Sequence, residues 1–282
     1  METLHDWLAK AEAYLVAHAV EEARLKAEML LSHHIKVPRL EFPMHREKTV
    51  PSLSIELKRL AHHEPIQYVL GCTNFFGLEM FCDQRALIPR PETEELVEHA
   101  LAFPFDHHID VGTGTGCIPL ALAEARPTAS CIGLDISPEA LSLAESNRKW
   151  LDLQNVRFLK SDLLQAVAEL PCDLITANLP YIPAKDCEEL ARQVRDFEPR
   201  LALDGGTSGL DLIERIMPQA FDLLSNGGRI LFEHGYDQRE PIRALLKKTG
   251  FDQIIEYKDF AGHDRITEGR RFGIAFTKEA HN

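Results

Sequence analysis

From about residue 93 onward, short apolar runs alternate with longer segments that have the periodicity of helices. This alternation restricts the fold more than any other feature of the chain. The predicted strands lie at 108–111, 131–134, 156–159, 174–177 and 229–233. The predicted helices lie between or after them at 118–124, 139–149, 210–223 and 238–248. Strands that alternate with helices pair in parallel, because each helix carries the chain back across a face of the sheet. We therefore expect an α/β fold with a mostly parallel sheet that is covered on both faces.

The two ends of the chain depart from this pattern. Residues 253–257 and 272–277 predict two further strands, joined by a polar loop, which would form an antiparallel hairpin at the edge of the sheet. Residues 3–63 have helical periodicity and predict a small bundle of helices. Segment 66–88 is rich in aromatic residues and glycine, and predicts a strand pair that links the bundle to the sheet. The expected domains are therefore a helical domain at 1–70, a hairpin linker at 71–90 and an α/β domain at 91–282.

Charge and cysteine usage restrict the class of protein. The chain has 31 basic and 44 acidic residues, which gives a net charge of −13. This is the wrong sign for a protein that binds the phosphate backbone of nucleic acids without sequence specificity. The six cysteines include no CxxC pair, and the first residues lack the basic start and apolar stretch of a signal peptide. We expect a soluble cytoplasmic protein without a membrane segment.

A glycine-rich loop follows the first predicted strand. It consists of Gly112, Thr113, Gly114, Thr115 and Gly116. Glycines let the backbone turn tightly and approach a ligand closely, since no Cβ atoms are in the way. Dinucleotide, nucleotide and methyl-donor sites all use such a loop, and a tight turn without a ligand is also possible. The loop alone therefore indicates a ligand site without identifying the ligand.

Acidic residues end the next two predicted strands. Asp135 follows the loop by about 20 residues, where a carboxylate can accept hydrogen bonds from both hydroxyls of a ribose. Asp162 follows the third strand and is placed to accept from an adenine amino group, with Leu163 against the ring. An acid in this position also caps helices. Because successive parallel strands end at one crevice, we favour a shared ligand site.

The fourth predicted strand ends in Asn178-Leu179-Pro180-Tyr181. The carbonyl oxygen of Asn178 can accept a hydrogen bond from an NH2 group. Pro180 favours an extended conformation at Leu179, which turns the carbonyl of Leu179 outward. Tyr181 offers a flat face on which a planar group can stack. The motif predicts a site for a planar NH2, either a carboxamide or the exocyclic amine of a base.

Together these motifs resemble those of class I S-adenosylmethionine-dependent methyltransferases. Segment 64–95, with its run Ile88-Pro89-Arg90-Pro91-Glu92-Thr93-Glu94, is similar to the family of peptide chain release factor glutamine methyltransferases. The segment 198–203 and the pair Gly205-Gly206 extend this similarity over nearly the whole chain. Without the resemblance, residues 90–94 read equally well as a proline turn that begins a helix.

The resemblance implies a Rossmann-like class I methyltransferase with a seven-stranded sheet, S-adenosylmethionine as cofactor and no metal. It further implies that residues 112–116, Asp135, Asp162, Leu163 and Asn178 contact the cofactor and that 178–181 hold the substrate. The implied reaction methylates the side-chain nitrogen, N5, of a glutamine in the Gly-Gly-Gln motif of release factors. The helical domain would help to recognise the release factor, and no nucleic acid would bind.

One residue departs from the family pattern. The family usually has Asn-Pro-Pro-Tyr, whereas Leu179 replaces the first proline here. Asn-Leu-Pro-Tyr is the form seen in ribosomal RNA adenine dimethyltransferases, so an adenine amino-methyltransferase that acts on RNA or DNA is an alternative. That enzyme needs an electropositive groove, which the net charge of −13 disfavours. A second alternative is an adaptor that binds the cofactor without turnover.

Overall fold

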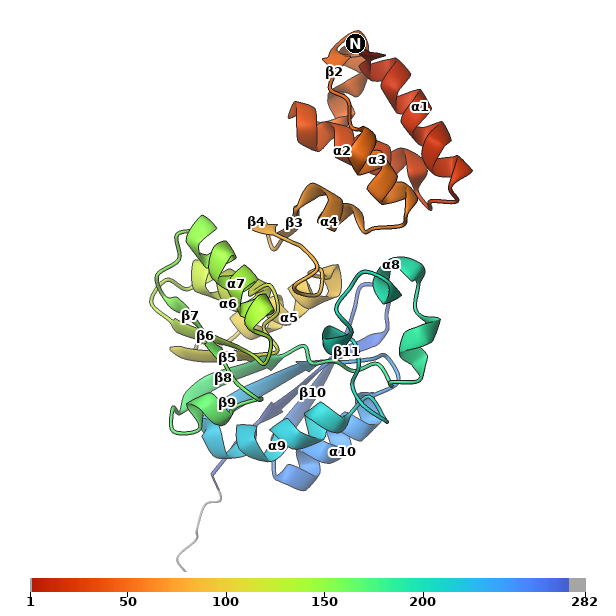
Figure 1. The fold of residues 1–282 in the computed structure, drawn as a ribbon. Coiled ribbons are helices and arrows are strands. Elements are labelled where there is room, and N and C mark those ends of the chain that lie inside the picture. The colour runs from red at the N-terminus through yellow and green to blue at the C-terminus, as the bar shows by residue number, and fades with distance from the viewer. Residues whose placement is uncertain (1, 274–282) are drawn as a thin grey trace, which may run out of the picture.

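The computed structural model describes residues 2–273, and a seven-stranded sheet forms its centre (Figure 1). The strands are β5 (His107–Val111), β6 (Ser130–Asp135), β7 (Val156–Lys160), β8 (Cys172–Ala177), β9 (Leu224–Glu233), β10 (Asp252–Lys258) and β11 (Asp264–Arg270). Their order in the sheet is β10-β11-β9-β8-β5-β6-β7. All neighbouring strands pair in parallel except β11, which is antiparallel to both β9 and β10. The predicted mostly parallel sheet with an antiparallel C-terminal hairpin is confirmed.

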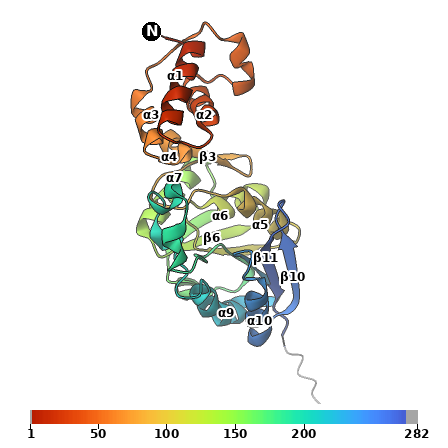
Figure 2. The ribbon, with the colours of Figure 1, turned by 90° about the vertical axis from the view of Figure 1, so that its right-hand side faces the viewer.

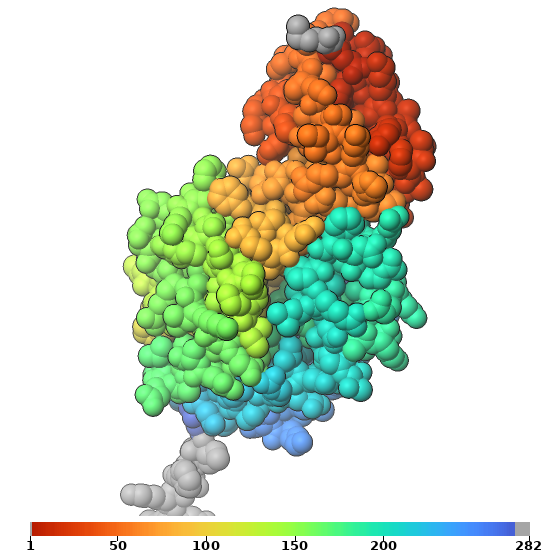
Figure 3. All heavy atoms as spheres, viewed as in Figure 1, coloured from red at the N-terminus to blue at the C-terminus, as the bar shows by residue number. Residues whose placement is uncertain are grey.

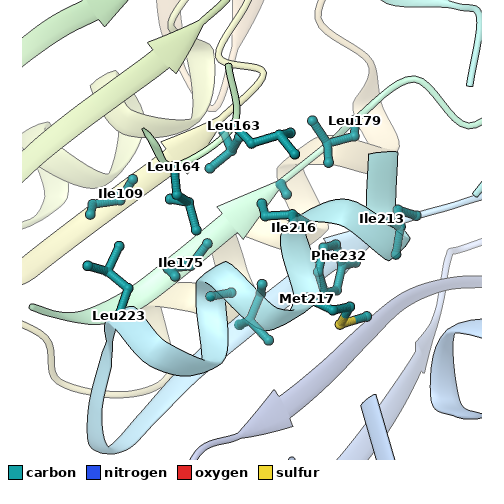
Figure 4. Packing of buried hydrophobic residues seen from close by; sticks show 14 of the residues in the cluster. Ile109, Leu163, Leu164, Ile175, Leu179, Ile213, Ile216, Met217, Leu223 and Phe232 are labelled. Carbon is teal, nitrogen blue, oxygen red and sulfur yellow. The ribbon is translucent and has the colours of Figure 1, made fainter. Parts of the chain in front are cut away.

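Helices cover both faces of this sheet. One face is covered by α5 (Pro91–Leu101), α6 (Cys117–Ala125) and α7 (Pro138–Trp150), and the other by α9 (Asp211–Leu223) and α10 (Arg239–Thr249). Ile216 and Met217 of α9 belong to the same buried core as Ile175 of β8 and Phe232 of β9 (Figure 4). A separate core joins α5 and α6 to the opposite face. Within residues 2–273 no helix is long and apolar enough to cross a membrane.

The N-terminal part forms a bundle of its own at one end of the molecule (Figures 1 and 2). It contains α1 (Leu4–Ala17), α2 (Ala23–Ile35), α3 (Ser54–Ala61) and α4 (Ile66–Leu70), the 3-10 helix η1 (Arg39–Met44), and the two-residue strands β1 (Glu2–Thr3) and β2 (Thr49–Val50). Leu15, Leu30 and Leu31 are fully buried in its core. The small helical bundle that the periodicity of this segment predicts is therefore confirmed.

A short hairpin joins the bundle to the sheet domain. Its strands β3 (Cys72–Phe75) and β4 (Leu78–Phe81) pair in antiparallel fashion around Phe76 and Gly77. The φ angles of these two residues are 51° and 79°, as in the tight turns that connect twisted strands. Phe81 exchanges two backbone hydrogen bonds with the side chain of Asn147 on α7. In the space-filling view this segment, orange to yellow, lies over the join between the green and the teal parts of the chain (Figure 3).

The strand pair begins later than segment 66–88 predicts. Residues 66–70 form the helix α4, in which Ile66, Tyr68 and Val69 are buried. Gly71 ends this helix with a φ of 74°, a left-handed conformation that glycine adopts without strain. These aromatic and β-branched residues therefore form a buried helical turn. Their packing in the tertiary structure outweighs their preference for strands.

The prediction was also wrong for the last strand. It placed this strand at 272–277, but β11 spans Asp264–Arg270; residues 272 and 273 are in no strand and 274–277 lie outside the described residues. Glu268 of β11 is fully buried, and accepts hydrogen bonds from Arg229 at 3.2 Å and from the hydroxyl of Tyr257 at 2.9 Å. A buried ionic network of this kind removes the apolar alternation by which strands are recognised in a sequence.

The remaining elements are short and lie in the connections after β7 and β8. They are α8 (Arg192–Arg195) and the 3-10 helices η2 (Gln165–Val167), η3 (Asp186–Glu189) and η4 (Arg200–Ala202).

Candidate active site

A pocket lies at the carboxyl ends of β5, β6, β7 and β8. The strand order reverses between β5 and β8, so the chain leaves these two strands in opposite directions and opens a crevice there. The residues that follow the four strands line the pocket at 112–115, 135–137, 161–163 and 178–180. Segment 85–90, Thr93 of α5, Arg215 of α9 and residues Pro199, Leu201 and Ala202 also line the pocket.

The structure brings together all but two of the predicted site residues. Gly116 does not line the pocket; a Cβ atom at this position would lie 2.8 Å from the ring of Phe158, so this glycine permits close packing of α6. Tyr181 does not line it either, and its backbone oxygen accepts a hydrogen bond from Gln238 at 2.8 Å. Burial raises the pKa of Tyr181 to about 12. Stacking of its ring on a substrate stays a prediction.

The glycine loop and the Asn178 motif are in contact. Val111 pairs with Ala177 in the sheet, so Gly112 and Asn178 leave neighbouring strands at the same level. Gly112 has a φ of 75°, and a Cβ atom there would lie 3.1 Å from Leu179 Cδ2 and 3.6 Å from the backbone oxygen of Asn178. The absence of a side chain at Gly112 therefore permits the close approach of the two loops.

A buried polar network supports β5 just before the glycine loop. Thr176 donates to Asp110 Oδ1 at 2.6 Å and accepts from the ring of His108 at 2.8 Å. Burial raises the pKa of Asp110 to about 7. Burial also lowers the pKa of His108 to about 3, which keeps the imidazole neutral. The network ties β8 to β5 directly below the pocket.

Asp135 shapes the glycine loop through its carboxylate. Its Oδ2 accepts from the backbone N–H of Gly114 and its Oδ1 from that of Ser137, both at 2.9 Å. Burial raises the pKa of Asp135, and these backbone hydrogen bonds oppose the rise. Each carboxylate oxygen has two lone pairs, so both oxygens can accept one further hydrogen bond from a ligand.

Asp162 has a partner that the sequence does not reveal. Its Oδ2 lies 2.7 Å from Nη2 of Arg215, and both side chains are more than a third exposed. The adjacent Leu163 is buried and has a φ of 52°, a left-handed conformation that costs energy for a residue with a Cβ atom. Leu163 therefore lines the pocket in a strained backbone conformation.

The side chain of Asn178 is held from behind. Its Nδ2 donates to Oγ1 of Thr93 at 3.2 Å, and the hydroxyl of Thr93 donates to Oε2 of Glu233 at 2.7 Å. Glu233 is the last residue of β9, and the pairing of Ala177 with Phe232 brings it beside Asn178. Burial raises the pKa of Glu233 to about 7, while the hydrogen bond from Thr93 opposes the rise. Neither Thr93 nor Glu233 was predicted as a site residue.

Segment 85–90 is fixed by a partly buried ion pair. Arg90 Nη2 lies 2.5 Å from Oε1 of Glu198, whose side chain is 1% exposed. The other oxygen of Glu198 accepts from the backbone N–H of Ile88 at 3.3 Å. Burial raises the pKa of Glu198, and the charge of Arg90 opposes the rise. The two sequence motifs that contain Arg90 and Glu198 therefore form one wall of the pocket.

Among residues 2–273 no three His, Cys, Asp or Glu side chains are grouped to hold a metal ion.

Two family models match the chain. Residues 105–261 match the methyltransferase domain, and residues 6–71 match the PrmC N-terminal domain.

Curated relatives match over nearly the whole length. The release factor glutamine methyltransferase of Geobacter sulfurreducens is 37% identical and covers 94% of this chain and 94% of its own length. The enzymes of that name from Vibrio cholerae and Escherichia coli strain K12 are 38% and 37% identical, and cover 95% and 96% of this chain and 96% and 100% of their own lengths.

Solved structures share the fold at low identity. A methyltransferase from Pyrococcus furiosus is 19% identical, covers 71% of this chain and 91% of its own, and has a TM-score of 0.55. The human methyltransferase 10 domain containing protein is 17% identical, covers 70% of this chain and 90% of its own, and has a TM-score of 0.52.

Proposed function

The chain belongs to the family of release factor glutamine methyltransferases, and from this premise we propose that it methylates N5 of the Gly-Gly-Gln glutamine in peptide chain release factors, with S-adenosylmethionine as the donor. The observation that carries the proposal is the orientation of Asn178. The NH2 group of Asn178 donates a hydrogen bond to Thr93. Its Oδ1, on the other side of the carboxamide, can therefore accept a hydrogen bond from a substrate amide. The reaction would take place in the cytoplasm, where translation terminates.

The pocket residues suit the cofactor, which supplies an electrophilic methyl group on a sulfonium sulfur. Gly112 and Gly114 have φ angles of 75° and 56°, and a Cβ atom at Gly114 would lie 3.8 Å from Ala86, in the space between the loop and segment 85–90. We assign residues 112–115 to backbone contacts with the cofactor. Asp135 would accept hydrogen bonds from its ribose hydroxyls, and Asp162 and Leu163 would contact its adenine. Gly116 would support this loop from the helix side.

The chain's own residues would act mainly by positioning. A carboxamide nitrogen is a poor nucleophile because its lone pair is delocalised into the carbonyl group. Asn178 Oδ1 and the backbone oxygen of Leu179 would accept the two N–H groups of the glutamine, which turns the nitrogen toward the methyl group. The same two oxygens would stabilise positive charge as it develops on the nitrogen. Acceleration then comes from orientation rather than from a strong base.

The domains divide the work in this proposal. Residues 91–282 would carry the reaction, and the bundle at 1–70 would help to recognise the release factor across the linker at 71–90. The bundle has a core of its own, which supports its treatment as a separate unit.

The proposed function is tested with labelled S-adenosylmethionine. The protein is incubated in turn with a purified release factor, with the same factor in which the Gly-Gly-Gln glutamine is changed to alanine, and with total RNA. We expect label in the unaltered release factor alone. Label in RNA would favour the adenine methyltransferase, and cofactor binding without any label would favour the adaptor.

The two pocket acids are expected to differ in their importance for the cofactor. Asp135→Ala leaves the partly buried N–H groups of Gly114 and Ser137 without these acceptors, so we expect Kd for S-adenosylmethionine to rise about 10- to 100-fold. Asp162→Ala removes a half-exposed carboxylate paired with Arg215, and should raise Kd less than about fivefold. Isothermal titration calorimetry measures both, with exposed Asp222→Ala on α9 as the control. Equal losses at the two acids would contradict the assignment.

Leu179 is expected to matter for stability more than for catalysis. Its side chain is 4% exposed and packs in the core with Leu163 (Figure 4). Leu179→Pro keeps the backbone oxygen but loses part of this packing, so the free energy of unfolding should fall by about 1–3 kcal/mol. We expect kcat to stay within about tenfold of the wild type, since the acceptor is retained. Denaturant unfolding and initial rates measure the two effects. A loss of kcat beyond a hundredfold would mean that the leucine side chain itself takes part.

A further inference from the structure

The reaction requires that the carboxamide of Asn178 present its oxygen, not its nitrogen, to the substrate. The two ends of a carboxamide have nearly the same size, so packing alone does not select between them. Turned by 180°, Asn178 would direct its own NH2 at the NH2 of the glutamine, and neither group could accept. Some other feature must therefore fix the orientation.

Thr93 supplies this feature because its hydroxyl has a single hydrogen. While the carboxyl group of Glu233 is ionised, that hydrogen is directed to its Oε2, at 2.7 Å. Toward Asn178, 3.2 Å away, the oxygen of Thr93 can then only accept. The group of Asn178 that faces Thr93 must be its NH2. The direction of the amide thus follows from the chemistry of the partners.

Glu233 acts on Asn178 through Thr93 and also directly, since the side chain of Asn178 favours the charged form of this carboxyl group. Its side chain is buried, does not line the pocket and is used by no step of the reaction described above. Two charged groups shift the pKa of Glu233: Arg265 of β11 lowers it and Glu92 of α5 raises it. A carboxyl group buried at the end of β9 is costly unless it has a hydrogen-bonding role. Thr93 is itself buried, with 2% exposure, and lines the pocket.

We propose that Thr93 and Glu233 are positioning residues that lock the carboxamide of Asn178 with Oδ1 toward the substrate. This inference rests on the proposed function for its role in catalysis. The lock itself is a property of the free protein.

The test measures the lock and the reaction separately. The side-chain NH2 signals of Asn178 are assigned by NMR through their loss in Asn178→Ala. We expect the wild type to show the shift of a hydrogen-bonded amide, Thr93→Val to lose it and Thr93→Ser to keep it. In rate measurements Thr93→Val should lower kcat about 10- to 100-fold with little change in KM, and Thr93→Ser should stay within about threefold of the wild type.

Thr267→Val is the matched control. Thr267 of β11 is fully buried and hydrogen-bonded to His234 at 2.8 Å, so its substitution also removes a buried hydroxyl but should leave kcat and the Asn178 signals unchanged. Glu233→Gln is a second variant, in which the new amide can turn either end to Thr93. It should broaden or double the Asn178 signals and lower kcat.

The outcomes separate the two proposals. An Asn178 signal that is unchanged in Thr93→Val, or a Thr93→Ser variant as slow as Thr93→Val, would overturn the lock. A wild-type protein that shows the hydrogen-bonded signal but transfers no methyl group to release factors would overturn the proposed function while supporting the lock.

Discussion

An Asn178→Ala variant is expected to keep less than about 1% of the wild-type kcat for methylation of a release factor. The substitution removes Oδ1, one of the two oxygens that would orient the substrate nitrogen and stabilise its developing charge. It also removes the donor to Thr93, which leaves the buried hydroxyl with Glu233 as its only partner. Because this contribution arises in the transition state, kcat should fall much more than KM rises.

The control for this prediction is binding of the cofactor. Asn178 is one of many residues that line the pocket at the ends of β5, β6, β7 and β8, so Kd for S-adenosylmethionine should rise less than about tenfold. Asn178→Asp is the matched variant: it keeps an acceptor but cannot donate to Thr93, and it places a second carboxyl near Glu233. We expect it to be intermediate in kcat. An alanine variant that keeps a tenth or more of the wild-type rate would contradict the central role of this residue.

The parts of the site that the sequence predicts are those with local signals. The glycine loop, Asp135 and Asn178 each follow directly on a buried parallel strand, and such strands end at one crevice. Their position could be read from strand ends without knowing which strands are neighbours. For the same reason the main sheet was predicted correctly, since its parallel strands are short apolar-rich segments that alternate with helical ones.

The partners of these residues could not be predicted in this way. Thr93 and Glu233 are 140 residues apart, Arg90 and Glu198 are 108 apart, and Asp162 and Arg215 are 53 apart. Each pair forms because separate elements pack together, and a single sequence contains no local sign of that packing. Glu233 in particular resembles an ordinary polar end to the strand β9. The strand β11 escaped prediction for a related reason, because its buried Glu268 is stabilised by residues of other elements.

The second large effect is expected at Gly205, whose backbone packs against residues 180 and 181 of the Asn178 motif. A Cβ atom at Gly205 would lie 2.6 Å from the backbone oxygen of Pro180 and 2.8 Å from Cα of Tyr181. Both are backbone atoms, so no side chain can turn aside to make room. The N–H of Gly205 also donates to the backbone oxygen of Ile182 at 2.8 Å, which fixes the two segments against each other. An added methyl group must therefore displace residues 180 and 181.

Gly205→Ala is accordingly expected to lower kcat at least about tenfold, because shifts of about 1 Å in positioning groups cost up to a hundredfold in rate. The cofactor should still bind, since the carboxylate of Asp135 and the loop before α6 are not touched. Gly227→Ala is the matched control: its φ of 82° is strained for alanine, but no atom of residues 2–273 lies within 4 Å of the added Cβ. It should lose about 1 kcal/mol of stability and keep the wild-type kcat.

Initial rates, cofactor titration and thermal unfolding of both variants distinguish displacement of the motif from general loss of stability. If Gly205→Ala lost stability but kept its rate, the position of residues 178–181 would not depend on this contact, and the close packing at Gly205 would serve the fold alone.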